Sequence, residues 1–374
     1  MQKLLKISLA ILIIILLCYF PQYLSHKQSG NIDGSSMHNS SSYTSDSIEN
    51  ELSDTTSEII PEEISSDESA DNESFTQEST VEETTTEEIT TNEIIVPNDI
   101  LISNTQHPAS LQFHDKNVMV YGDINPNSED VIKLQQTLQS YNKNISLAVW
   151  RTDNAKALTY NTNQTYFSAC TIKIAYVLAC CKVIDNGYAD ENTMLTYQER
   201  HYHQGSGKIR KSEYGTSYSI KDLINLSLSI SDNVAYKMLL EHFGLQTYNS
   251  IVKSLGCNSL IINRMWGSRV NVNDYITLWN EVYNYFSSGA KMSEHLKNSC
   301  TNTPFNYGTK TLTNIDYSHK SGDNFGESAV YNDAGIVWGD NHYIYAVFTN
   351  SEGTSYDIQT VNTVMEMVHK IMTN

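Results

Sequence analysis

Apolar residues recur with two different periods between about residue 113 and the C-terminus. A spacing of three to four residues, typical of helices with one buried face, predicts helices at 128–141, 172–185, 220–230, 234–243 and 358–372. Gly187 follows the second of these stretches, and glycine is the residue that most often ends a helix. The sequence Ser219-Ile220-Lys221-Asp222 resembles a capping box and predicts where the third helix begins.

The second period is that of strands. The runs 145–150 and 157–160 are separated by Thr152-Asp153-Asn154 and predict a β-hairpin. The runs 316–322, 329–338 and 343–349 predict three further strands, the last two joined by a turn at 339–341. Helical segments therefore lie between strands from both ends of this region.

The first residues have a different pattern. Lys3 and Lys6 precede an almost unbroken apolar run from residue 7 to residue 20, as in a signal sequence. No cleavage site with small residues follows clearly, so residues 1–26 are predicted to be an uncleaved signal anchor, with a cleaved signal peptide as the alternative. By the positive-inside rule, both place the remaining chain outside the cell, and the first places the N-terminal helix in the membrane.

Composition separates the next segment from the folded part. The chain has 43 acidic and 24 basic residues and a net charge of −19, but about 20 of the acidic residues and no Lys or Arg lie between Gln28 and Asp115. Such a segment buries too little apolar surface to fold, so 27–110 is predicted to be a disordered tether and 111–374 a single, nearly neutral domain. The domain is expected to be a monomer. No basic patch is available for phosphates, so no nucleic-acid partner is expected.

The first candidate catalytic residues lie in the sequence Cys170-Thr171-Ile172-Lys173. Residues three apart share one face of a helix, so Lys173 lies within reach of Cys170 and can act as the base that a nucleophile needs. Taken alone, this spacing is common in helices.

Two later motifs support the interpretation of Cys170 and Lys173 as a catalytic pair. Ser231-Asp232-Asn233 lies at a junction between two predicted helices, where it is also an ordinary N-cap signal. Lys320-Ser321-Gly322 lies inside a predicted strand, and a glycine there indicates close approach by another backbone or a ligand.

In this order and at this spacing, the three motifs resemble those of the penicillin-recognising serine hydrolases, class A β-lactamases in particular, whose pattern is S-x-x-K, S-D-N, and K-T-G or K-S-G. The resemblance covers residues from about 144 to the C-terminus. It implies an α/β (α+β) fold of the β-lactamase/transpeptidase type. An antiparallel sheet built from both ends of the domain is flanked by helices, and an all-helical lobe carries the second motif.

The resemblance also implies roles for single residues. Cys170 takes the position of the nucleophile and Lys173 that of the adjacent base. Ser231 would relay a proton to the leaving nitrogen. Asn233 would hold the side-chain amide of the substrate.

The strand motif would bind the rest of the substrate. Lys320 and Ser321 would hold its carboxylate through charge-assisted hydrogen bonds, beside Gly322. The backbone N–H groups of Cys170 and Asp323 would form the oxyanion hole.

Cys170 is a departure from the family pattern, which has serine. A thiol at a helix N-terminus beside Lys173 and Lys320 is expected to have a lowered pKa, and its thiolate is a strong nucleophile. Sulfur is larger than oxygen, however, and a displaced nucleophile in a site shaped for serine would degrade or silence catalysis.

A second departure concerns deacylation. Class A β-lactamases activate the deacylating water with a glutamate about 34 residues beyond the asparagine of the second motif, and that offset reaches Gly267 here. No Asp or Glu lies between Glu241 and Asp274. An acyl-enzyme is therefore predicted to be long-lived.

The remaining residues of interest have ordinary explanations. His201 and His203 are predicted to be solvated loop histidines rather than metal ligands, and no cofactor or metal is expected. Disulfide pairing cannot be deduced from the sequence, and buried packing is favoured for the adjacent Cys180 and Cys181. The other two cysteines of the folded region are Cys257 and Cys300.

Three hypotheses for function follow. The first is an acyl-transfer hydrolase of the cell envelope that acts on β-lactams or on the stem peptides of peptidoglycan through a thioester on Cys170. The alternative is a catalytically silent protein that binds or senses the same ligands. The third is a surface protein whose tether is the functional part, and the intact set of Lys173, Ser231, Asn233 and Lys320 argues against it.

Overall fold

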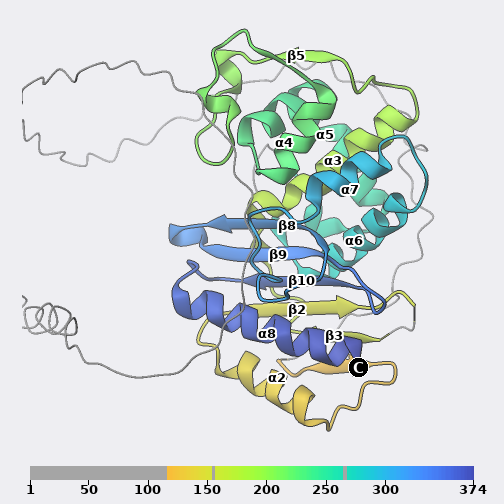
Figure 1. The fold of residues 1–374 in the computed structure, drawn as a ribbon. Coiled ribbons are helices and arrows are strands. Elements are labelled where there is room, and N and C mark those ends of the chain that lie inside the picture. Colours follow the sequence, from red (N-terminus) through yellow and green to blue (C-terminus); the bar gives the residue numbers. More distant parts are fainter. Residues whose placement is uncertain (1–115, 154–155, 264–267) are drawn as a thin grey trace, which may run out of the picture. The chain divides into compact units, whose positions relative to one another are not determined.

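A six-stranded antiparallel sheet forms the centre of the protein, with strand order β1-β3-β2-β10-β9-β8 (Figure 1). The structure is a computed structural model that describes residues 116–153, 156–263 and 268–374. Strands β2 and β10 pair across the middle of the sheet, so the two ends of the domain meet there as expected. The strands are β1 (Met119–Tyr121), β2 (Ile145–Trp150), β3 (Ala157–Tyr160), β8 (Tyr317–Asn324), β9 (Val330–Val337) and β10 (Tyr343–Thr349).

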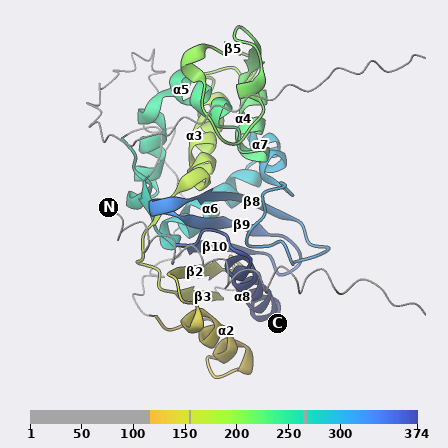
Figure 2. The same cartoon turned by 90° about the vertical axis from the view of Figure 1, so that its left-hand side faces the viewer.

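Both faces of the sheet are covered, which is why β10 is buried along its whole length. Side chains alternate between the two faces of a strand. Tyr343, Tyr345 and Val347 pack with α2 (Glu129–Ser140) and α8 (Ser355–Thr373), whereas Ile344 and Ala346 belong to the larger core on the opposite face (Figure 2).

The opposite face is covered by the helical lobe. Its helices are α3 (Lys173–Asp185), α4 (Ile220–Ser229), α5 (Asn233–Ser254), α6 (Val272–Phe286) and α7 (Ser293–Cys300). Helix α3 lies inside this lobe, with apolar residues buried all around it. Two small sheets complete the lobe, β4 (Tyr166–Phe167) with β7 (Arg269–Val270) and β5 (Met194–Thr196) with β6 (Ser217–Ser219).

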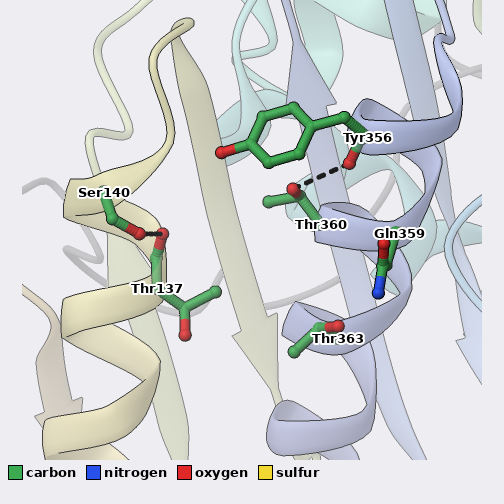
Figure 3. A pocket seen from close by; sticks show the side chains of 6 residues that line it. All are labelled: Thr137, Ser140, Tyr356, Gln359, Thr360 and Thr363. Atoms are coloured by element: carbon green, nitrogen blue, oxygen red, sulfur yellow. Dashed lines mark hydrogen bonds between the residues drawn. The ribbon is translucent and has the colours of Figure 1, made fainter.

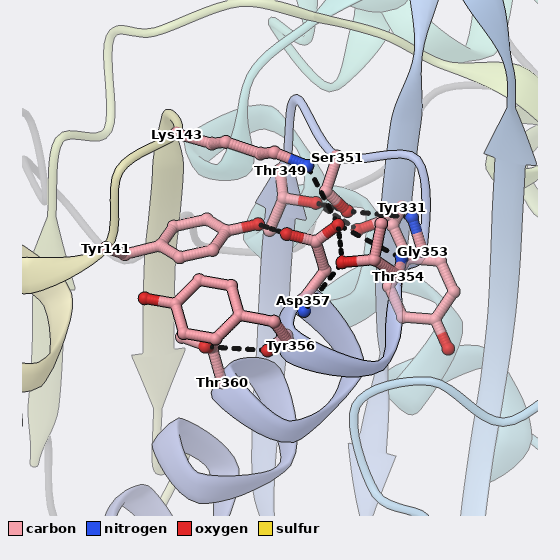
Figure 4. A network of polar contacts seen from close by, with 10 residues as sticks. All are labelled: Tyr141, Lys143, Tyr331, Thr349, Ser351, Gly353, Thr354, Tyr356, Asp357 and Thr360. Carbon is pink, nitrogen blue, oxygen red and sulfur yellow. Dashed lines mark hydrogen bonds and ion pairs between the residues drawn. The ribbon is translucent and has the colours of Figure 1, made fainter. Parts of the chain in front are cut away.

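A buried carboxylate anchors the start of α8. Asp357 is fully buried, and it accepts hydrogen bonds from the Tyr141 hydroxyl at 2.7 Å and from Lys143 Nζ at 2.9 Å (Figure 4). It also forms a capping box with Thr354. Because Tyr141 ends α2, this cluster ties α2 to α8 on the face of the sheet away from the helical lobe.

Most predicted elements are confirmed. The stretch 234–243 forms the first part of α5, which Gly244 at φ 75° divides into two helices, and the second of these, as far as Ser254, was not predicted. Helices α6 and α7 lie in a region for which no helix was predicted. Within the described ranges, no helix is both long and apolar enough to cross a membrane. The predicted anchor 1–26 and tether 27–110 lie outside those ranges.

Candidate active site

Cys170 lies on a short 3-10 turn, η2 (Ala169–Ile172), directly before α3, and its side chain is half-buried. Ala169 has φ 46°, a left-handed conformation that side chains with a Cβ rarely adopt. The turn is held by Thr171, whose Oγ1 bonds to the Ser168 carbonyl and the Tyr275 hydroxyl, both at 2.6 Å. A strained but well-anchored turn therefore presents the thiol.

Lys173, one turn further on, is fully buried. Its Nζ donates to the Ser231 carbonyl at 2.7 Å, to Ser231 Oγ at 3.3 Å and to Asn233 Oδ1 at 2.8 Å. The thiol of Cys170 lies 3.9 Å from the same Asn233 oxygen. The first two sequence motifs thus meet in one hydrogen-bonded cluster.

Asp232 holds the second motif in place. Its Oδ1 caps α5 by accepting from the backbone N–H groups of Val234 and Ala235, and its Oδ2 accepts from those of Lys208 and Ile209. The carboxylate is fully buried and has four N–H donors, so its role is structural. It fastens the loop around residue 207 beside the cluster.

The third motif approaches from β8. A Cβ on Gly322 would lie 2.6 Å from the backbone nitrogen of Cys170, so only glycine allows β8 to lie this close to η2. Lys320 is buried on the same strand, and its Nζ donates to the Ser321 carbonyl at 2.9 Å. The structure therefore brings Lys320 and Gly322 to the cluster formed by Cys170 and Lys173.

Two predicted site residues have other partners for their side chains. The Ser321 hydroxyl donates to the carbonyl of Phe305. The Asp323 carboxylate accepts from the Tyr307 hydroxyl at 2.7 Å. These bonds could not be predicted from the sequence, because residues 305 and 307 lie in a loop without a recognisable motif.

The charges in the cluster favour ionisation of the thiol. Burial by itself raises the pKa of Cys170, but the ammonium groups of Lys173 and Lys320 outweigh it, and the net effect lowers that pKa. Burial also lowers the pKa of Lys173, so this amine loses its proton more readily than an exposed lysine. Burial lowers the pKa of Lys320 to about 8.

The chain matches the family model Beta-lactamase2, described as the β-lactamase enzyme family, over residues 131–372. This chain belongs to that family. The β-lactamase ROB-1 of Haemophilus influenzae is 28% identical over 136 residues, which cover 35% of this chain and 44% of that relative. The match thus spans less than half the length of the curated relative.

Solved structures of the same fold cover more of the chain. The β-lactamase of Sphaerobacter thermophilus has a TM-score of 0.58 at 18% identity, over 65% of this chain and 97% of that one. A variant of PBP-A in an acyl-enzyme complex with penicillin G has a TM-score of 0.57 at 20% identity, over 64% and 94% of the two chains. These likenesses confirm the predicted β-lactamase-like fold.

A separate hollow lies away from this cluster. It has a volume of about 290 Å³ and lies between α2 and α8, where Tyr356 and Thr360 face Thr137 and Ser140 (Figure 3). These helices cover the face of the sheet opposite the helical lobe, so the hollow is not part of the site around Cys170.

The structure also shows the surroundings of His201 and of the cysteines outside the site. His201 was expected to be solvated, and this is wrong: it is buried, with Nε2 2.9 Å from Glu241 Oε2. Within the described ranges, no group of three or more His, Cys, Asp or Glu side chains is arranged to hold a metal. The buried packing predicted for Cys180 and Cys181 is confirmed, since both thiols are free and buried.

Proposed function

We propose that this domain is an extracytoplasmic acyl-transfer hydrolase that forms a thioester between Cys170 and the acyl group of a β-lactam or a D-alanyl-D-alanine-like peptide. The observation that carries the proposal is the environment of the thiol. It is partly exposed at the start of α3, its pKa is lowered, and Lys173 and Lys320 supply the positive charge. Such a thiol is placed for nucleophilic attack rather than for packing.

The residues around the thiol suit each step of acylation. The sulfur attacks the amide carbonyl carbon, the C–N bond breaks, and the nitrogen leaves with a proton relayed through Ser231, whose Oγ is 3.3 Å from Lys173 Nζ. The N–H groups of Cys170 and Asp323 would stabilise the oxyanion. The ammonium of Lys320 would attract the substrate carboxylate.

Release of the acyl group is expected to be slow. The buried acid of the second motif, Asp232, already accepts four backbone N–H bonds and cannot serve a water as base. The position where class A β-lactamases carry their deacylating glutamate is Gly267, which lies outside the described residues. Asn233 donates from Nδ2 to the Gln204 carbonyl at 2.9 Å, so it would have to exchange this bond to hold the side-chain amide of the bound acyl group.

Burst kinetics with a chromogenic cephalosporin test this proposal. Wild-type protein should release about one equivalent of product rapidly and then continue slowly, because acylation outpaces deacylation. The Cys170→Ala variant should show no burst. Fast turnover without a burst would contradict slow deacylation. Neither burst nor turnover in the wild type would favour the silent binding protein instead.

We further propose that residues 27–110 hold this domain away from a membrane anchor at 1–26, outside the cell. The acidic composition of the tether and the apolar run near the N-terminus support this location. Protease treatment of intact cells should then release the domain into the medium. If the domain is released only after the cells are lysed, the location is wrong.

A further inference from the structure

A loop beside β8 forms a hydrogen bond with the Ser321 hydroxyl. We call residues 303–309 the strap. It lies along the face of β8 that carries Ser321 and Asp323, because the Phe305 carbonyl accepts from Ser321 Oγ and the Tyr307 hydroxyl donates to Asp323 at 2.7 Å. The Tyr307 ring also stacks on Tyr331 of β9, with ring centroids 4.0 Å apart.

The strap is fastened to the sheet by a buried carboxylate. Asp333 of β9, the cross-strand neighbour of Ser321, is fully buried. Its Oδ2 accepts from the backbone N–H groups of Tyr307 at 3.1 Å and Gly308 at 2.7 Å. Removing this carboxylate would leave both N–H groups of the strap without their acceptor.

The other carboxylate oxygen reaches the strap through a histidine. Asp333 Oδ1 lies 2.9 Å from Nδ1 of His319, which is also fully buried. His319 Nε2 lies 2.7 Å from Thr303 Oγ1, at the first residue of the strap. The strap is therefore anchored on both sides of Phe305, and the Phe305 carbonyl has little freedom to move.

This anchoring decides where the Ser321 proton points. A serine hydroxyl has one proton to donate, and a carbonyl oxygen can only accept. The bond between Ser321 Oγ and Phe305 therefore uses the single donor of Ser321. A substrate carboxylate is also only an acceptor, so it competes with Phe305 for the same proton.

We propose that the strap is a specificity element that withdraws Ser321 from carboxylate recognition, so that Lys320 and not Ser321 attracts a substrate carboxylate. This inference rests on the proposed function and deepens it, because it names how the site recognises its substrate. Asp333 and His319 act as positioning residues, since they touch the strap rather than the substrate.

Two β-lactams that differ only in the carboxylate test the proposal: benzylpenicillin and its methyl ester. The rate of adduct formation on Cys170 is measured by intact-protein mass spectrometry. On the otherwise wild-type chain, Ser321→Ala should change either rate by less than about twofold, because the hydroxyl does not donate to the ligand. A loss of about tenfold or more with benzylpenicillin alone would overturn the proposal.

Releasing the strap should make the rate of acylation by benzylpenicillin depend on Ser321. Asp333→Leu removes both anchors, and the milder Thr303→Val removes only the contact to His319. In either background, Ser321→Ala should now slow benzylpenicillin about tenfold and leave the ester unaffected, since a freed hydroxyl donates to the carboxylate. If Ser321→Ala still has no effect in both backgrounds, the strap does not control the hydroxyl.

Asp357→Leu is the matched control for loss of stability. Asp357 is equally buried and also accepts several hydrogen bonds, but it lies at the start of α8 (Figure 4). The Asp357→Leu variant should lower the midpoint of thermal unfolding and leave the effect of Ser321→Ala on the acylation rates unchanged.

Failure of the proposed function gives a different result. Wild type would then form no adduct with either compound. In that event, calorimetric binding of benzylpenicillin to Cys170→Ala, with and without Ser321→Ala, decides the question. Affinities within about twofold support the strap proposal, and a difference of about tenfold overturns it.

Discussion

Replacing Lys173 with methionine tests whether this lysine activates the thiol. The side chain is fully buried, and its charge is the largest of the influences that lower the pKa of Cys170. An opposite charge at close range lowers a pKa by roughly 1–3 units. Because Lys320 remains, we expect Lys173→Met to raise the pKa of Cys170 and to leave about 10–100-fold less thiolate below the midpoint.

Alkylation by iodoacetamide measures the thiolate directly. The reagent is small and uncharged, so its rate does not depend on carboxylate binding, and its pH profile gives the pKa of the reacting thiol. The profile of Lys173→Met should move to higher pH. Lys182→Met is the matched control, because Lys182 lies on the same helix and is paired with Glu281 at 2.5 Å, away from Cys170. It should leave the profile unchanged.

Coincident profiles for wild type and Lys173→Met would refute the assignment of Lys173 as the activating group. A shift with Lys320→Met but not with Lys173→Met would move that role to Lys320, whose charge is the next influence on the thiol. Equal shifts with Lys173→Met and the Lys182→Met control would show that the change is a general effect of lost stability.

Three further predictions concern Lys320, Gly322 and the loop around residue 207. Acylation by a penicillin should rise with pH as Cys170 ionises and fall as Lys320, with a pKa of about 8, loses its proton; Lys320→Arg should remove the falling limb, because arginine stays charged. Gly322→Ala should slow acylation about 100-fold with little change in far-UV circular dichroism, because its Cβ would lie 2.6 Å from Cys170 N. Gly207→Ala should lower the free energy of unfolding by about 2–3 kcal/mol in urea titrations, because its Cβ would overlap the Asp232 carboxylate that caps α5. Gly215→Ala is the control, because Gly215 also has a positive φ, 94°, but open space around it, and it should lower the free energy of unfolding by about 1 kcal/mol.

Local patterns predicted the elements that hold the site. The spacing of Cys170 and Lys173 fixed their position at one helix start, and the glycine of the strand motif was expected to mark close approach by a backbone. The same reasoning predicted the hairpin of β2 and β3, because alternation and turn residues are both local signals.

Long-range bonds could not be predicted in this way. The Ser321 hydroxyl points to Phe305 because Asp333 and His319 fasten the strap, and all of these partners come from separate elements. His201 is buried by its contact with Glu241, forty residues away in sequence, although its polar neighbours indicated a solvated loop. Periodicity describes a segment by itself, whereas these contacts depend on which segments meet.

The central claim is that Cys170 carries the acyl group. Intact-protein mass spectrometry of this protein with a penicillin tests it most directly, beside Cys170→Ala and Cys170→Ser. The wild type should gain the mass of one penicillin and keep it, Cys170→Ala should gain none, and peptide mapping should place the adduct on Cys170. An unmodified wild type beside an acylated Cys170→Ser would contradict the claim, because the site would then be intact and silenced by its own cysteine.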